Sequence, residues 1–417
     1  MATPRIIHLA QTISASVAKI QDVLTAQGLQ TPSFDEDASH YLPLEVLEAQ
    51  NAVLDATSEL NDLLMEPMSM IHCLGGHNNS LCSQAITRFR IASLIPPGGT
   101  KSFAEIASQT PLSEQMVTRI LRQAMSMRIF CEPEPGMVGH TKASRILVDP
   151  VTNDWLGAGT EELWPAATKV VDALEKWPGS EEPSETGFCL ANNTTDSIYA
   201  FLGANPTRAA RFGNAMVAYS KKPEFSPAYL TDHFDWSSLG AATVVHLGGG
   251  TGFYAMELAK KFADLKVVVQ DMAFMMGPAE AGVPEELKGR VTFEAHDFFA
   301  PQIVNADVVF FRWVLRTWGD KYCIAALKAQ LPMLKSGARV VVQDMILPEP
   351  GKGPFWKERA ARSADMSLTA GFNSRDRTVD DWKTLFTAAD EGFVLKSVAE
   401  PKGSALGILE FVWESKK

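Results

Sequence analysis

The 417-residue sequence lacks the features of a membrane or secreted protein. No run approaches the roughly 18 consecutive apolar residues that cross a bilayer. Residues 1–24 follow an amphipathic helical pattern, without the apolar block and small-residue cleavage site of a secretion signal. We therefore expect a cytoplasmic protein that has no membrane partner.

Cysteine and positive charge are also scarce. The cysteines are odd in number and no pair has Cys-x-x-Cys spacing, which argues against a disulfide framework and a zinc site; they are Cys73, Cys82, Cys131, Cys189 and Cys323. Lysine and arginine total 38 against 49 aspartates and glutamates, which gives a net charge of −11. That balance excludes a general binder of nucleic acid. The hydrophobic content of 46% is typical of a globular enzyme.

The first part of the chain, residues 1–150, is predicted to be helical with a winged-helix pattern. Apolar residues recur at helical spacing from Leu42 to Met68, either as a partner surface or as a hairpin closed on its own domain. Residues 100–145 read as a short helix, a longer amphipathic helix and a Pro/Gly hairpin. Because the chain is acidic and the wing has few lysines, we interpret this module as a dimerisation or lid element and not as a DNA reader.

Two further parts follow. Residues 151–235 are predicted to be a helical connector that lines the substrate pocket, with an exposed loop over 176–195. Residues 236–417 alternate short apolar strands with helices, which indicates an α/β domain with a doubly wound, mostly parallel sheet. The last strand pattern, GILEFVWE, is expected to run antiparallel at one side.

A glycine-rich turn lies between the first strand and helix of this α/β domain. It contains Gly248, Gly249, Gly250 and Gly252, where the backbone turns sharply and a ligand approaches closely. The next strand ends in Asp271, about 23 residues after the first glycine, where a carboxylate would meet a ribose. Gly250-x-Gly252-x-x-Ala255 also satisfies the loose dinucleotide fingerprint, but the packed GGGTG run favours S-adenosylmethionine (SAM) over a nicotinamide cofactor.

Beyond these motifs, the chain resembles the fungal and plant class of SAM-dependent O-methyltransferases with an N-terminal winged-helix dimerisation domain. The resemblance rests on ILRQAMSMRIF, HTKAS, VVHLGGGTGFYAMELAKKF, VVVQDM, HDFF, FFRWVLRTWGDKYCIAAL, VVVQDMILPEPG and DRTVDDWKTLF. It implies a homodimer through the N-terminal domain and a small, hydrophobic substrate. It also implies a cofactor site formed by the four glycines with Asp271, Met272, Asp297, Phe298 and Arg312.

One step departs from the family pattern. Members that methylate a hydroxyl carry a histidine general base in an HDW-x-D step, where this chain has Arg316-Thr317-Trp318-Gly319-Asp320. The acids that flank that histidine in plant members correspond to Asp344 and Asp376. A guanidinium keeps its proton at neutral pH, so Arg316 donates hydrogen bonds and cannot accept a hydroxyl proton. The exchange favours stabilisation of charge on a carbonyl oxygen over proton abstraction.

With arginine at this position, the chain resembles the non-methylating pericyclases of pyridone alkaloid pathways, the leporin-cyclase type. That resemblance implies an Alder-ene or hetero-Diels–Alder step, with or without prior dehydration, on a polyketide-derived pyridone. It assigns the catalytic roles to Arg316 and His140, with Asp320 and Thr231 as further candidates, and leaves open whether SAM is bound.

Other interpretations stay open. The same motifs also fit a SAM-dependent O-methyltransferase of a fungal metabolite and a SAM-binding scaffold. Arg316 has a structural alternative as the ion-pair partner of Asp320 or of a buried acid. His140 has one as a residue that fixes the wing to the helix beginning near Thr141.

Overall fold

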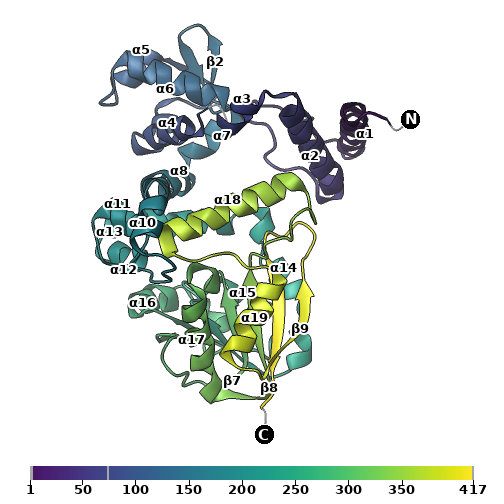
Figure 1. The fold of residues 1–417 in the computed structure, drawn as a ribbon, viewed down its shortest axis with the longest axis vertical. Helices are drawn as coiled ribbons and strands as arrows, with labels where there is room; N and C mark the ends of the chain where they lie inside the picture. The colour runs from purple at the N-terminus through teal and green to yellow at the C-terminus, as the bar shows by residue number, and fades with distance from the viewer. Residues whose placement is uncertain (1–2, 73–74, 416–417) are drawn as a thin grey trace. The chain divides into compact units, whose positions relative to one another are not determined.

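The computed structural model describes residues 3–72 and 75–415, so Cys73 lies outside the described residues. The chain forms two compact units, each built from several segments (Figure 1). Unit 1 comprises Met1–Thr168, Tyr199–Tyr219 and Pro350–Ala360, and unit 2 comprises Lys169–Ile198, Ser220–Glu349 and Ala361–Lys417. The three-part division at residues 150 and 235 remains a prediction.

Unit 1 begins with four helices: α1 (Arg5–Ala26), α2 (Leu47–Leu64), α3 (Pro67–His72) and α4 (Gly76–Arg88). Helices α1 and α2 pack on each other, and the Arg5 guanidinium binds the Glu59 carboxylate with two nitrogens. The pair does not cover all of its apolar residues. Leu64, Met68 and Ile71 are 71%, 76% and 84% exposed, which leaves an uncovered apolar edge at the end of α2 and on α3.

The expected winged helix is present. Helices α5 (Phe103–Ala107) and α6 (Glu114–Ser126) pack beside a three-stranded antiparallel sheet ordered β1-β3-β2. The strands are β1 (Thr100–Ser102), β2 (Cys131–Glu134) and β3 (Met137–Gly139), and α7 (Lys142–Arg145) follows. A buried cluster that includes Phe103, Leu121, Phe130 and Val138 holds the module together.

Short helices form the middle of the chain. They are α8 (Pro150–Ala158), a π-helical turn (Gly159–Leu163), α9 (Trp164–Ala167), α10 (Val170–Lys176), α11 (Gly187–Asn192), α12 (Ile198–Gly203), α13 (Pro206–Ser220) and α14 (Ala228–Asp232). The prediction of a continuous loop over 176–195 was wrong at α11. The Thr186 hydroxyl accepts a hydrogen bond from the Cys189 amide at 3.1 Å and caps this helix, whose Phe188 is fully buried.

Unit 2 contains a seven-stranded sheet ordered β6-β5-β4-β7-β8-β10-β9. The strands are β4 (Thr243–Leu247), β5 (Lys266–Asp271), β6 (Val291–Ala295), β7 (Ala306–Arg312), β8 (Leu334–Asp344), β9 (Phe393–Ala399) and β10 (Gly407–Trp413). The first five places in the order are parallel, and β10 runs antiparallel to both β8 and β9. This arrangement confirms the predicted doubly wound, mostly parallel sheet with an antiparallel last strand.

Helices cover this sheet: α15 (Phe253–Lys261), α16 (Ala273–Ala281), α17 (Asp320–Gln330) and α19 (Val379–Ala389), while α18 (Phe355–Phe372) connects the two units along the chain. Two buried clusters form the core, and the Phe386 and Phe411 rings stack at 3.6 Å within one of them. The strand order reverses between β4 and β7. In open α/β sheets, ligands bind beyond the carboxyl ends of the strands at such a point.

The described residues form neither a membrane-spanning helix nor a disulfide bond. None of their helices is both long and apolar enough to cross a membrane. Cys82, Cys131, Cys189 and Cys323 are free thiols there.

Candidate active site

The glycine turn after β4 has the geometry of a ligand cradle. Gly248, Gly250 and Gly252 have φ values of 64°, 56° and 74°, in the left-handed region that glycine favours. A Cβ atom on Gly252 would lie 2.5 Å from the Phe293 ring, whereas one on Gly250 would meet no atom within 4 Å. Gly252 is therefore required by internal packing, while Gly250 has open space at the position where a side chain would begin.

Asp271 at the end of β5 closes onto this turn. Its Oδ2 accepts a hydrogen bond from the Gly250 amide at 2.8 Å, and its Oδ1 accepts one from the Met272 amide at 2.7 Å. Met272 is 49% exposed beside this partly exposed carboxylate. A carboxylate next to an open glycine turn fits a ribose, and an exposed methionine fits the edge of an adenine, so these residues suit SAM. Gly249 completes the turn, and a Cβ atom there would lie 2.7 Å from Val269 and 2.8 Å from His246.

The segment after β6 brings aromatic rings to the same end of the sheet. The Asp297 carboxylate accepts a hydrogen bond from the Phe299 amide at 3.0 Å, which shapes the turn. Phe298, Phe299, Trp318 and Tyr322 form one aromatic cluster, with the Phe299 and Trp318 ring centroids 4.8 Å apart. Asp297 and Phe298 therefore lie in a loop supported by the start of α17.

Arg312 ends β7 and connects three elements. Its Nε donates to Gln343 Oε1 at 3.0 Å on β8, and its Nη2 donates to the Tyr254 hydroxyl at 2.7 Å on α15. The guanidinium also lies 3.6 Å from the Tyr254 ring centroid. Burial lowers the pKa of Arg312 to about 10, so the side chain stays cationic at neutral pH. Arg312 adds positive charge beside the glycine turn, because Phe311 pairs with Leu247 directly before it.

Arg316 lies between two buried acids. Its Nε and Nη2 donate to the two carboxylate oxygens of Asp376 at 2.9 and 2.8 Å, and Nε lies 3.8 Å from Asp344 Oδ1. Both acids have fully buried side chains, while that of Arg316 is 13% exposed. Nη1 makes no hydrogen bond to the part of the chain that the structure describes. The fork that could hold a substrate carbonyl is thus largely occupied by Asp376.

The two acids differ in their hydrogen bonds. Asp376 has both oxygens paired with Arg316. Asp344 Oδ1 accepts from the Met345 amide at 2.8 Å, but its buried Oδ2 has no partner among the described residues. Burial raises the pKa of Asp344 to about 6, and it also raises the pKa of Asp376, where Arg316 offsets part of the rise. Two carboxylates therefore share one adjacent arginine.

The other three predicted catalytic residues are not joined to Arg316 by any hydrogen bond or ion pair in the described ranges. Asp320 binds Arg377 at 2.6 Å and Arg375 at 2.9 Å, so the pairing of Arg316 with Asp320 was wrong and the pairing with a buried acid was right. The Thr231 hydroxyl donates to Asp232 at 2.7 Å, beside Lys261. The catalytic roles of Asp320 and Thr231 stay predictions.

His140 lies inside the winged helix of unit 1. Its ring nitrogens contact the Ser144 hydroxyl at 3.1 Å and the Ile95 carbonyl at 3.2 Å. The side chain is buried, and burial lowers its pKa. Both nitrogens are thus used to fix the wing to α7, the structural alternative that the sequence left open.

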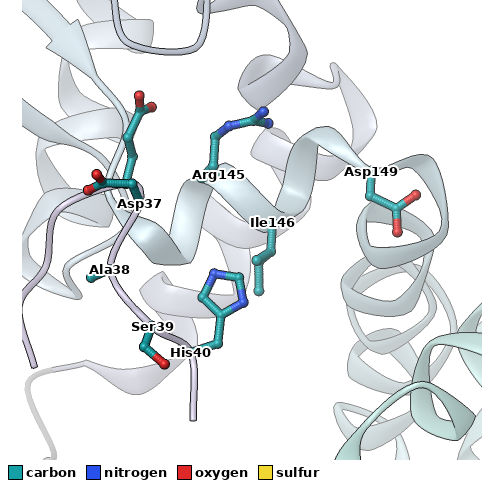
Figure 2. Close-up of a pocket in the computed structure, with 8 residues that line it drawn as sticks. Asp37, Ala38, Ser39, His40, Arg145, Ile146 and Asp149 are labelled. Carbon is teal, nitrogen blue, oxygen red and sulfur yellow. The ribbon is translucent and has the colours of Figure 1, made fainter. Parts of the chain in front are cut away.

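Unit 1 also has an open pocket of about 520 Å³ that the sequence did not predict. Figure 2 shows that it is built from the extended segment with Asp37 and His40 and from the helical turns with Arg145 and Asp149. Its lining residues belong to unit 1, whereas the predicted cofactor residues belong to unit 2.

Comparison with known proteins places the chain in a class and a family. Residues 195–394 match the O-methyltransferase domain model and residues 71–150 match the O-methyltransferase dimerisation domain model. The chain is 41% identical to O-methyltransferase PaMT of Phomopsis amygdali over 99% of its own length and 97% of that protein. It is 34% identical to a chlorophenol O-methyltransferase of Trichoderma longibrachiatum, over 99% and 91%.

Two solved structures share the fold over 97% of this chain and all of theirs. LepI in complex with SAM has a TM-score of 0.73 at 22% identity, and a protein described as a pericyclic reaction enzyme has a TM-score of 0.73 at 21% identity. The fold and the matched domains define an enzyme of the methyltransferase class. The chain belongs to the O-methyltransferase family, and this membership confirms SAM as the type of cofactor.

Sequence reasoning missed a repeated hexapeptide. VVVQDM occurs at 267–272, where it ends β5, and again at 340–345, where it ends β8. In both copies the aspartate Oδ1 accepts a hydrogen bond from the following methionine amide. The repeat is visible in the sequence, but only the structure reveals that Oδ2 of Asp271 is paired and Oδ2 of Asp344 is not.

Proposed function

We propose that this chain is a SAM-dependent O-methyltransferase that methylates a hydroxyl group of a small aromatic metabolite. The observation that carries the proposal is the pairing of the Arg316 fork with Asp376 beside a second buried acid, Asp344. Because Nε and Nη2 are held by Asp376, the arginine cannot present two adjacent donors to a carbonyl and has Nη1 left for a substrate oxygen. The surrounding carboxylates provide oxygens that can accept a proton, which methylation of a hydroxyl requires.

The cofactor residues follow from the glycine turn. The open backbone at Gly250, the carboxylate of Asp271 and the exposed Met272 would hold the ribose and adenine, while Arg312 would face the carboxylate of SAM. The bound cofactor supplies an electrophilic methyl group on a sulfonium. This chain's own residues orient the hydroxyl, exclude water and take up its proton.

The substrate is proposed to be a phenol of raised acidity. The centre lacks the imidazole base of related enzymes, and an acidic hydroxyl is more easily ionised, so it depends less on a strong base. The 34% identical relative is named for chlorophenol, a phenol whose ring substituent increases acidity. Hydrophobic packing around the aromatic cluster of Phe298, Phe299 and Trp318 suits an apolar ring.

A panel of phenols of graded acidity tests this proposal. We expect the protein, incubated with methyl-labelled SAM, to form S-adenosylhomocysteine (SAH) and a methyl ether, fastest with the more acidic phenols. Calorimetry with SAH verifies that the cofactor site is intact. Tight binding of SAH without methylation of any phenol would count against methyl transfer.

A pericyclic reaction on a pyridone is the second candidate. One specific observation favours it: Arg316 has Nη1 available as a hydrogen-bond donor at the position where relatives place a base. We place it second, in reverse of the expectation from sequence, because the other two donors of the fork are bound to Asp376. Stereoselective cyclisation of a pyridone alcohol without added SAM, if it is lost in Arg316→Ala, would favour the pericyclic reaction over methyl transfer.

A further inference from the structure

The unpaired oxygen of Asp344 is unusual for a buried carboxylate. Oδ2 lies at the end of β8 with no solvent access and no hydrogen-bond partner among the described residues. Burying a polar atom without a partner costs about 1–3 kcal/mol, and more when the atom carries charge. Such atoms are rare in native folds and often mark a functional site or an absent ligand. We therefore expect a bound molecule to supply the hydrogen-bond donor for Oδ2 of Asp344.

The repeated hexapeptide provides an internal comparison. Asp271 and Asp344 occupy equivalent places at the carboxyl ends of parallel strands, and each uses Oδ1 to accept the next methionine amide. Asp271 Oδ2 is satisfied by the Gly250 amide at 2.8 Å. The same local sequence thus produces the same Oδ1 hydrogen bond in both copies. The two aspartates differ in burial, since Asp271 is partly exposed and Asp344 is fully buried, and in what faces Oδ2. At Asp344, none of the described residues donates a hydrogen bond to Oδ2.

The polar side chains around Asp344 donate their hydrogen bonds to other groups and not to Oδ2. Arg316 lies nearest but donates to Asp376, and its Nε is 3.8 Å from Asp344 Oδ1. Arg312 on β7 donates to Gln343 and Tyr254. Arg377, which follows Asp376, donates to Asp320. The Cys323 thiol on α17 donates to the carbonyls of Leu315 and Trp318.

The other groups that could accept a proton are less suited. Asp376 has both oxygens engaged by Arg316, and Asp320 is bound by two arginines. His140 has both ring nitrogens engaged within unit 1. His246 is fully buried, and burial lowers its pKa to about 3, which makes it a weak base. His296 follows β6 at the edge of the sheet, four places from β8 in the strand order.

We propose that Asp344 accepts, on Oδ2, the proton that the substrate hydroxyl loses during methyl transfer, while Arg316 Nη1 stabilises the oxygen as it becomes negative. In this step the hydroxyl O–H bond breaks and an O–CH₃ bond forms. The S–CH₃ bond of SAM breaks with its electron pair left on sulfur, which yields SAH. Oδ2 is covered in the single chain, so the bound substrate or one water molecule has to enter beside it; the proton passes to Asp344 by that route and later returns to solvent. This inference rests on the proposed methyl transfer.

The acidity of the site supports this assignment. A base is most effective when its pKa is near the working pH. Burial raises the pKa of Asp344 to about 6, close to that of an ordinary imidazole at about 6.5. Asp344 is thus ionised at neutral pH and can take up a proton, which Arg316 cannot. The loss of the family's histidine is then compensated by an acid whose basicity approaches that of the missing ring.

Asp344→Asn tests the inference because it keeps the shape of the side chain and removes its basic oxygen. With phenol, which reaches the enzyme neutral, we expect kcat/KM to fall about 10²- to 10⁴-fold. With 4-nitrophenol at mildly alkaline pH, where the hydroxyl is already ionised, most of the activity should remain. Equal losses with both substrates, or no loss with phenol, would overturn the inference.

Two matched variants control for indirect effects. Asp235→Asn removes an exposed carboxylate that caps a loop through Ser237 and Ser238, and it should leave both substrates unchanged. Asp376→Asn releases the Arg316 fork and should reduce activity with both substrates alike. Unchanged SAH affinity in calorimetry would establish that each variant keeps its cofactor site.

A spectroscopic measurement tests the same residue without turnover. In the wild-type protein with SAH bound, difference infrared spectroscopy should detect a buried protonated carboxyl group that titrates near pH 6. In the folded Asp344→Asn protein this band should be absent. No titrating carboxyl band between about pH 5 and pH 8 would overturn the role of Asp344. Methylation of no phenol, with the band present, would instead overturn the proposed function.

Discussion

Burial of Asp344 couples its proton to the stability of the fold. The rise of its pKa from an ordinary value of 3.8 to about 6 means that the folded protein holds this proton up to a higher pH than the unfolded chain. The stability that the proton provides is fully present below about pH 4 and is lost as the pH rises through about 6. At neutral pH the buried charge therefore costs up to about 3 kcal/mol.

Asp344→Asn should therefore stabilise the protein at neutral pH. We expect a higher melting temperature than wild type near pH 7.5 and little difference near pH 4, measured by thermal unfolding in the two buffers. In the wild-type protein, the buried carboxylate would then lower the stability of the fold while it provides a proton acceptor. A variant that melts below wild type at neutral pH would indicate that the attraction between Asp344 and Arg316 outweighs the cost of burial.

Gly250 and Gly252 are expected to have different roles: Gly250 faces the ligand, and Gly252 is needed for packing. Gly250→Ala adds a methyl group to open space, so we expect a loss of only about 1–2 kcal/mol from the left-handed backbone but a clear weakening of SAH binding. Gly252→Ala places its Cβ 2.5 Å from the Phe293 ring and should destabilise the fold itself. Calorimetry with SAH and thermal melting distinguish the two effects. Unchanged SAH affinity in Gly250→Ala would remove that glycine from the cofactor cradle.

The sequence indicated which residue type departs from the family at position 316 but not what that residue binds. Asp320 is four residues away and was a natural partner, whereas Asp376 is on a segment that follows α18. The fold brings Asp376 to Arg316 and gives Asp320 to Arg377. Side-chain partners across distant segments depend on packing that no local pattern encodes.

The wing and α7 are joined through His140. Both ring nitrogens bridge different parts of the module, Nδ1 to Ser144 and Nε2 to the Ile95 carbonyl. His140→Ala leaves these two groups unpaired in a buried place, so we expect a loss of about 1–3 kcal/mol and unchanged kcat per folded enzyme. Thermal melting and single-substrate kinetics measure the two quantities. A large fall in kcat with an unchanged melting temperature would support the catalytic role that the family resemblance implied.

The accuracy of the predicted elements follows from how each is buried. The parallel strands β4, β5, β7 and β8 are covered on both faces, so they appear in the sequence as unbroken apolar runs. Strand β9 lies at the sheet edge and exposes most of its residues, such as Val394 at 51%, and it was not predicted. Helix α11 was missed because polar residues surround its short apolar stretch. Elements that are buried on both faces can therefore be predicted from the sequence, whereas half-buried elements beside polar loops cannot.

At the level of the whole chain, the apolar residues that remain exposed in unit 1 agree with the dimerisation domain matched over residues 71–150. The sequence left open whether the N-terminal helices close on themselves or face a partner. In the single chain, α1 and α2 pack together, yet Leu64, Met68 and Ile71 stay more than two-thirds exposed. Contiguous exposed apolar groups of this kind mark interaction surfaces. A second copy of the chain is the partner that the family domain suggests.

Ile71→Asp should weaken this association. The side chain is 84% exposed in the single chain, so the substitution costs the monomer little, but a charge buried at an interface without a partner is strongly unfavourable. We expect light scattering after gel filtration to give a dimer for wild type and a monomer, or a concentration-dependent mixture, for Ile71→Asp. Val171→Asp is the matched control, because Val171 is an apolar residue of α10 in unit 2 that is 70% exposed. A dimer that persists in Ile71→Asp and dissociates in Val171→Asp would place the interface on α10, because the added charge perturbs association only where the second copy covers it.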